Sequence, residues 1–137
     1  MGLKLTAIVD GASRGNPGQA AIGVLVRDQE GREVLKIAQT IGETTNNVAE
    51  YTALITCLER LNQPNIEALT VKTDSQLLAR QLEGVYKVRN PKLQPLFQKV
   101  RELLSSRNFP VTIQNVPRTE TKEADRLANQ ALNLAGF

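Results

Sequence analysis

Four carboxylic acids stand where this sequence predicts the ends of strands or the beginnings of helices. Asp10 follows the apolar run LKLTAIV and opens the stretch DGASRGNPG, and Asp74 closes the run ALTVKTD. Glu50 and Asp125 fall in the first turns of two helical patterns. Crowded carboxylates repel one another unless they take up protons or bind a cation, and Mg²⁺ prefers oxygen ligands. If the fold brings these acids together, they predict a site for hard divalent cations.

Each acid also has an ordinary structural explanation. Asp10 stands in a common turn dipeptide, Asp74 suits the cap of a following helix, and acids near helix N-termini are favoured by the helix dipole. Glu50 fits such an explanation least well, because it shares a helix face with apolar residues that should point inward. These residues are Leu54, Cys57 and Leu61.

The absence of histidine narrows the possible chemistry. The chain contains no histidine, which excludes Ser-His-Asp and Cys-His catalysis and the usual zinc sites. Hydrolysis of a phosphodiester between two divalent ions about 4 Å apart needs only carboxylates and therefore fits. The single cysteine, Cys57, lies among apolar helical positions and predicts a buried, reduced thiol in a cytoplasmic protein.

The charge distribution favours a polyanionic partner. Residues 84–118 hold seven lysines and arginines and one acid. If four of the 14 acids belong to a metal site, ten remain against 17 basic residues. A basic, metal-loaded protein would attract nucleic acid by releasing condensed counterions. Taken alone, the basic segment is more simply explained as a helix with a solvated charged face.

The predicted elements form a single α/β domain over residues 1–137. Three strands in succession predict an antiparallel meander, and the later strands alternate with helices, so they need parallel crossovers. On this topology the four acids meet at one rim of the sheet. The predicted strands cover 3–9, 20–28, 32–42, 68–74 and 111–116, and the predicted helices 46–62, 75–82, 91–106 and 121–135.

The longest apolar run, AAIGVLV, is much shorter than a membrane span. We therefore expect a soluble, cytoplasmic protein. No apolar helix face is left over for an obligate protein partner, so we expect a monomer.

Four motifs in order resemble the type 1 ribonuclease H family over nearly the whole chain. The motifs are DGASRGNPG, TTNNVAEYTAL, TDSQLL and KEADRLANQAL. The resemblance implies a ribonuclease H-like fold, with a five-stranded mixed sheet of order 3-2-1-4-5 and helices on both faces. It also implies an endoribonuclease that cuts the RNA strand of RNA/DNA hybrids and leaves 5′-phosphate and 3′-hydroxyl ends. Two Mg²⁺ or Mn²⁺ ions would act in the substrate complex.

The resemblance further implies roles for individual residues. The catalytic, metal-binding carboxylates would be Asp10, Glu50, Asp74 and Asp125. Substrate contacts, to RNA 2′-hydroxyls, the minor groove and a DNA phosphate, would come from a second set. This set is Ser13, Gly15, Asn16, Thr45, Asn46, Asn47 and Gln76.

Three departures from the family pattern concern the last loop and a missing insertion. Many members carry a histidine before the last aspartate, and Arg118 is the nearest substitute; it can contact phosphate but cannot act as a base. Thr121 stands where the family usually has asparagine. The tryptophan-containing basic handle is missing, as in a subgroup found in bacteria and archaea.

Two alternatives stay open. One is a catalytically weak module that binds hybrid or double-stranded RNA, and the other is a nuclease of the same fold that also cuts double-stranded RNA. The four acids disfavour a pure binding module, because repelling charges beside a phosphate backbone would weaken its binding.

Overall fold

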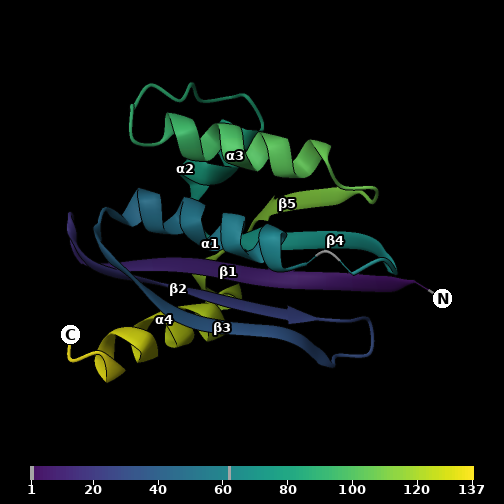
Figure 1. Ribbon diagram of the computed structural model, residues 1–137, viewed down its shortest axis with the longest axis horizontal. Coiled ribbons are helices and arrows are strands. Elements are labelled where there is room, and N and C mark those ends of the chain that lie inside the picture. The colour runs from purple at the N-terminus through teal and green to yellow at the C-terminus, as the bar shows by residue number, and fades with distance from the viewer. Residues whose placement is uncertain (1, 62) are drawn as a thin grey trace.

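The computed structural model of this protein describes residues 2–61 and 63–137. It contains one five-stranded mixed sheet with helices on both faces (Figure 1). The strands are β1 (Leu3–Gly15), β2 (Gly18–Arg27), β3 (Glu33–Thr44), β4 (Ile66–Thr73) and β5 (Val111–Asn115). The helices are α1 (Asn46–Arg60), α2 (Gln76–Leu82), α3 (Gln94–Ser105) and α4 (Lys122–Leu134), with a 3₁₀ turn at Arg118–Glu120.

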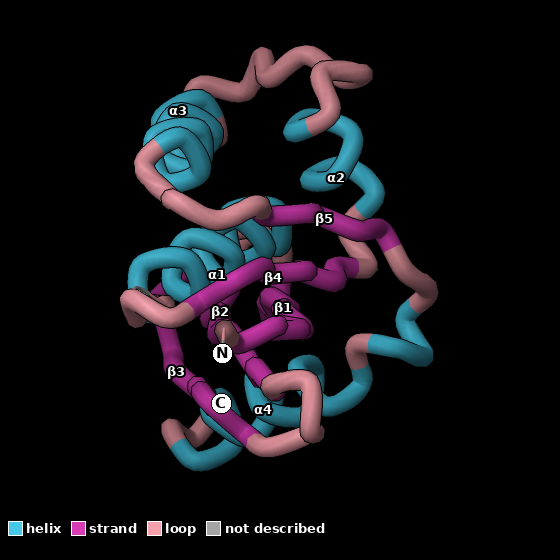
Figure 2. The backbone as a smooth tube through the Cα atoms, turned by 90° about the vertical axis from the view of Figure 1, so that its right-hand side faces the viewer, coloured by secondary structure: helices cyan, strands magenta, loops and turns pink. Residues whose placement is uncertain are grey.

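The sheet has the order β3-β2-β1-β4-β5, which confirms the predicted fold. β1, β2 and β3 pair antiparallel, and β4 and β5 continue the sheet parallel to β1. Figure 2 shows α1 and α4 on opposite sides of this sheet, with α2 and α3 beyond α1. β1 and β4 therefore run in the same direction, which places Asp10 and Asp74 toward the same rim of the sheet.

β1 is longer than the sequence predicts. The sequence predicts a strand that ends at residue 9 and offers a turn at Asp10 as one alternative, but Asp10 pairs with Gly23 inside the hairpin of β1 and β2. The parallel partner β4 stops earlier, because its last pair joins Lys72 to Ile8 of β1. Asp10 thus lies just beyond the end of the parallel pairing, where its side chain can face a site while its backbone stays fixed by β2.

Two glycines allow helices to approach the strands on either side of Asp10. A Cβ atom on Gly11 would lie 2.4 Å from the carbonyl carbon of Ala49 in α1. A Cβ atom on Gly23 would lie 1.9 Å from the carbonyl oxygen of Ala124 in α4. Any side chain would therefore push the helices away. These close approaches bring the helices that carry Glu50 and Asp125 toward Asp10.

The face of α1 that carries Glu50 is buried, as the sequence predicts. Leu54, Cys57 and Leu61 all lie in the main core with the inner faces of the central strands. Burial raises the pKa of the Cys57 thiol to about 12, so this cysteine is inert packing. Glu50 is consequently held by its helix against the sheet.

The helices begin and end within about two residues of the predicted ranges, except at the start of α3. Thr45 caps α1 and Ser75 caps α2 through hydrogen bonds to Val48 and Leu78. The predicted stop at Asn62 lies outside the described residues. The prediction that α3 begins at Pro91 was wrong. Residues 90–93 instead form a turn closed by the carbonyl of Asn90, and Pro95 occupies the first turn of the helix.

The described helices include none with the length and apolar character that crossing a membrane requires.

Candidate active site

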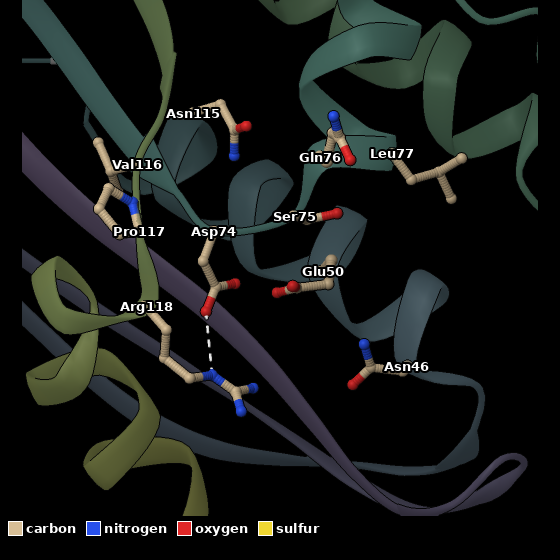
Figure 3. Close-up of a pocket in the computed structure, with 10 residues that line it drawn as sticks. All are labelled: Asn46, Glu50, Asp74, Ser75, Gln76, Leu77, Asn115, Val116, Pro117 and Arg118. Atoms are coloured by element: carbon tan, nitrogen blue, oxygen red, sulfur yellow. Dashed lines mark hydrogen bonds and ion pairs between the residues drawn. The ribbon is translucent and has the colours of Figure 1, made fainter.

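Three of the four predicted acids converge at the rim of the sheet. Asp10 comes from β1, Glu50 from the first half of α1, and Asp74 from the residue after β4. One carboxylate oxygen of each lies within 4.8 Å of the others. Figure 3 shows Glu50 and Asp74 directed toward one another from separate elements. The sequence separations of these acids are large, so the sheet topology creates the cluster.

Asp10 is the most buried of the three acids. Asp10 is 1% exposed, and neither of its carboxylate oxygens has a hydrogen-bond partner among the described residues. Burial, followed by the charges of Glu50 and Asp74, raises the pKa of Asp10 to about 9. A buried carboxylate without a partner is costly. These oxygens therefore fit a cation, which would supply the missing partner.

Glu50 has one internal hydrogen bond. The backbone N–H of Gly11 donates to its Oε1 at 2.6 Å, and the residue is 5% exposed. Burial raises the pKa of Glu50 to about 8, against the opposing effect of the Gly11 hydrogen bond. The close approach of Gly11 to α1 thus both admits the helix and orients its carboxylate.

Asp74 is held from the side of the loop that follows β5. Its Oδ2 accepts hydrogen bonds from Thr121 Oγ1 at 3.1 Å and from Arg118 Nε at 3.3 Å. The Thr121 residue is fully buried, whereas the Arg118 side chain is 77% exposed. Arg118 therefore lies beside Asp74 at the edge of the site, and most of its side chain remains accessible to a ligand.

The hydroxyl of Thr121 was not predicted to contact the acids. At sequence level this residue was only a departure from the family's asparagine. In the structure the hydroxyl donates to Asp74 Oδ2 at 3.1 Å and also lies 3.3 Å from the backbone carbonyl oxygen of Arg118. Its position just before α4 could have drawn attention to it, because threonine often caps a helix. In the structure, however, its side chain makes no capping hydrogen bond to α4.

Asp125 is placed beside this cluster rather than within it. It is absent from the tight group of three, yet it contributes, after burial and the charges of Glu50 and Asp74, to the raised pKa of Asp10. Its Oδ1 accepts a hydrogen bond from Asn129 Nδ2 at 3.1 Å. The contact with Asn129, four residues later on the same helix, was missed, although that spacing could have indicated it.

A hollow of about 750 Å³ opens beside the acids (Figure 3). Glu50, Asp74 and Arg118 line it together with two predicted substrate residues, Asn46 and Gln76. The amides come from the first residues of α1 and α2, and both residues are exposed. The hollow therefore combines acids, a cation and neutral amides on one accessible surface.

The other predicted substrate residues lie around the start of α1 or in the hairpin of β1 and β2. Asn16 Oδ1 accepts a hydrogen bond from the backbone N–H of Asn46 at 3.0 Å, so the hairpin is tied to α1. Ser13 donates to the carbonyl of Gly15, which has a φ of 120°. Thr45 caps α1 through its side chain. Asn47 is exposed. Their contacts with substrate stay predictions.

The family comparison covers most of the chain. Residues 8–131 match the family model described as "Reverse transcriptase-like". The matched range includes all four predicted acids, the glycine-rich hairpin and most of α4.

Individual proteins give a more specific likeness. The "Ribonuclease HI" of Halobacterium salinarum is 41% identical over 132 residues, which cover 96% of this chain and 66% of that protein. The bifunctional protein Rv2228c of Mycobacterium tuberculosis is 38% identical, over 97% of this chain and 36% of its own length. This chain therefore spans about two thirds or less of these relatives.

One solved structure contains a nucleic acid. LC11-RNase H1, isolated from compost, has been solved in complex with an RNA/DNA hybrid. It is 39% identical, with a TM-score of 0.90, and the match covers 97% of this chain and 99% of that one.

Proposed function

Because the chain belongs to the type 1 ribonuclease H family, we propose that it hydrolyses the RNA strand of RNA/DNA hybrids. The observation that carries the proposal is the buried cluster of Asp10, Glu50 and Asp74, in which both oxygens of Asp10 lack a partner among the described residues. Such a cluster costs stability unless a cation fills it. The products would carry 5′-phosphate and 3′-hydroxyl ends.

The donor set fits a hard divalent cation. All its ligands are carboxylate oxygens, which suit Mg²⁺ or Mn²⁺, and the chain has no histidine to favour zinc. We assign Asp10, Glu50 and Asp74 as metal ligands and Asp125 as the fourth, on the side of Asp10. Two such ions in the substrate complex would activate a water and stabilise the leaving oxygen.

Arg118 would help to hold the scissile phosphate. Its side chain is mostly exposed and already pairs with Asp74. A guanidinium keeps its proton at neutral pH, so it can donate to phosphate oxygens but cannot accept a proton from water. Arg118 would therefore bind and orient the phosphate, or speed product departure, without replacing the proton transfer of a histidine.

Recognition of the hybrid would come from the residues around the hollow. Asn46 and Gln76 present amides on either side of Glu50 and Asp74 (Figure 3). The hairpin with Ser13, Gly15 and Asn16 would lie against RNA 2′-hydroxyls, which distinguish RNA from DNA. Asn47 would contact the minor groove and Thr45 a phosphate of the DNA strand.

The charge of the whole molecule supports a nucleic-acid substrate. Apart from the four acids assigned to metal, 17 basic residues face ten acidic ones. The resulting basic surface would give a salt-dependent affinity for hybrid. Complex formation by a relative with a hybrid supports the same partner.

The decisive experiment compares three substrates of one sequence. RNA labelled at its 5′ end is offered as RNA/DNA hybrid, double-stranded RNA and single-stranded RNA, in Mg²⁺ or Mn²⁺ at low salt and with protein in excess. We expect cleavage of the hybrid, and none by the Asp10→Asn variant, which controls for contaminating nuclease.

Two results would change this conclusion. No cleavage of hybrid by the wild-type protein, together with equal hybrid binding by wild type and Asp10→Asn in EDTA, would mean a binding module. Equal cleavage of hybrid and double-stranded RNA would mean that the protein does not require a DNA strand opposite the RNA that it cuts.

A further inference from the structure

Asn129 connects the fourth carboxylate to a basic side chain. Its Nδ2 donates to both the backbone carbonyl oxygen and Oδ1 of Asp125, at 3.0 and 3.1 Å. Its Oδ1 accepts a hydrogen bond from Arg14 Nη2 at 3.4 Å. Because a guanidinium only donates and a carboxylate only accepts, these two partners fix which end of the amide faces which way.

Arg14 in turn ties the hairpin of β1 and β2 to the end of α4. Its Nη2 donates to Asn133 Oδ1 at 2.8 Å, and its Nη1 donates to the backbone carbonyl of Phe137. Figure 1 shows the hairpin tip and the C-terminal end of α4 at the same end of the molecule. Arg14 stands between Ser13 and Gly15, in the segment proposed to meet RNA 2′-hydroxyls.

Asp125 needs such support more than the other acids. Gly11 orients Glu50, and Thr121 holds Asp74, from outside the cluster. Asp125 is only partly buried and lies outside the tight group of three. Because Asn129 holds Oδ1 of Asp125, rotation of the Asp125 carboxylate is restricted, and Oδ2 is left to bind a cation. Hydrogen-bonding partners behind metal ligands commonly fix ligand orientation in this way.

We infer that Asn129 is a positioning residue for Asp125, and that Arg14 fixes the Asn129 amide and so links the RNA-facing hairpin to the fourth carboxylate. The inference rests on the proposed function, in which Asp125 is a metal ligand. In this inference Asn129 acts on turnover through its hydrogen bond to Asp125 and not through contact with substrate or metal.

The chain offers a matched control on the same helix face. Asn133 also accepts a hydrogen bond from Arg14, one turn after Asn129, but makes no hydrogen bond with Asp125. Asn129→Ala and Asn133→Ala each remove one amide from the tie between hairpin and helix. Alanine favours a helix, so both variants should fold, which thermal melting checks.

The test uses two measurements on these variants, on Asp125→Asn and on the Asp125→Asn/Asn129→Ala double variant. One is steady-state cleavage of hybrid, and the other is calorimetric titration of the substrate-free protein with Mn²⁺. We expect Asn129→Ala to lower kcat about tenfold at nearly constant KM and to weaken Mn²⁺ binding, as loss of a supporting hydrogen bond does. Asn133→Ala should match the wild type in both.

The double variant decides whether Asn129 acts through Asp125. If it does, adding Asn129→Ala to Asp125→Asn changes neither kcat nor Mn²⁺ affinity further. Arg14→Gln should lower kcat less than Asn129→Ala does, and should have no added effect on kcat in the Asn129→Ala background.

Equal behaviour of Asn129→Ala and Asn133→Ala would overturn the inference, because the amides would then only tie helix to hairpin. Independent, multiplying effects in the double variant would also overturn it. If the wild type cuts no hybrid, the proposed function fails, yet the Mn²⁺ titration still applies. In that case, equal Mn²⁺ affinity of wild type and Asn129→Ala would refute the positioning role.

Discussion

Replacing Asp10 by asparagine should make the metal-free protein more stable while abolishing cleavage. Asp10 is 1% exposed, and burial together with Glu50 and Asp74 raises its pKa from 3.8 to about 9. The folded protein therefore holds a proton that the unfolded chain releases above its own pKa. Stability is lost progressively as the pH rises from the unfolded value toward the folded one, and no more is lost beyond that.

The size of the effect follows from the same shift. At 1.36 kcal/mol per pKa unit, keeping Asp10 protonated in the folded state costs about 4 kcal/mol at about pH 7 and less than half as much at about pH 5. Asparagine has nearly the same shape as aspartate but carries no ionisable group, so it avoids this free-energy cost. If half of it is recovered, the Asp10→Asn variant gains about 2 kcal/mol at neutral pH, or about 8 °C in melting temperature for a domain of this size.

The assay is thermal unfolding in EDTA at both pH values, with and without Mg²⁺. We expect a larger gain at neutral pH than at acid pH, and stabilisation by Mg²⁺ in the wild type but not in Asp10→Asn. If Asp10→Asn melted lower than the wild type in EDTA, or gained equally at both pH values, the raised pKa would not explain the cost of the site.

Three further substitutions test how the site is held. Gly23→Ala places a methyl against the carbonyl of Ala124 and should destabilise the fold by about 3 kcal/mol or more, measured by urea unfolding, because backbone cannot yield as a side chain can. Thr121→Val keeps the buried volume but removes the donor to Asp74, so we expect a loss of about 1 kcal/mol in stability and a lower kcat, with an unchanged kcat arguing against support of Asp74. Arg118→Ala should lower kcat about tenfold, and Arg118→Lys should lower it less because lysine keeps the positive charge. An equal loss of kcat in both variants would show that the positive charge is not sufficient at this position.

The sequence was sufficient to predict the architecture because the patterns were long and regular. Alternating strands and helical stripes each predicted an element, and the chain order then predicted which strands are parallel, while the full strand order came from the family resemblance. The convergence of Asp10, Glu50 and Asp74 followed from topology alone. The prediction needed no knowledge of side-chain contacts, since the acids sit where elements begin or end.

What the sequence could not predict were contacts between backbones and the length of a pairing. Asp10-Gly11 is typical of a turn, yet here the antiparallel hairpin continues through it, since the pairing partner lies in β2. Gly11 and Gly23 serve close helix packing rather than bending, which depends on the distance between layers. The hydrogen bond from Arg14 to Asn129 likewise joins β1 to α4, and no pattern within either element predicts it.

The position of Asp10 explains why stability and activity oppose each other in this fold. β2 holds its backbone, while the parallel pairing with β4 ends two residues before Asp10, so that its side chain lies near Asp74. Gly11 and Gly23 let a helix close over each side, and this removes the water that would otherwise solvate the carboxylate. The desolvation that penalises the bare carboxylate also strengthens its attraction for a divalent cation. Selection for stability alone would disfavour a buried Asp10, so its presence beside Glu50 and Asp74 agrees with the proposed cation site.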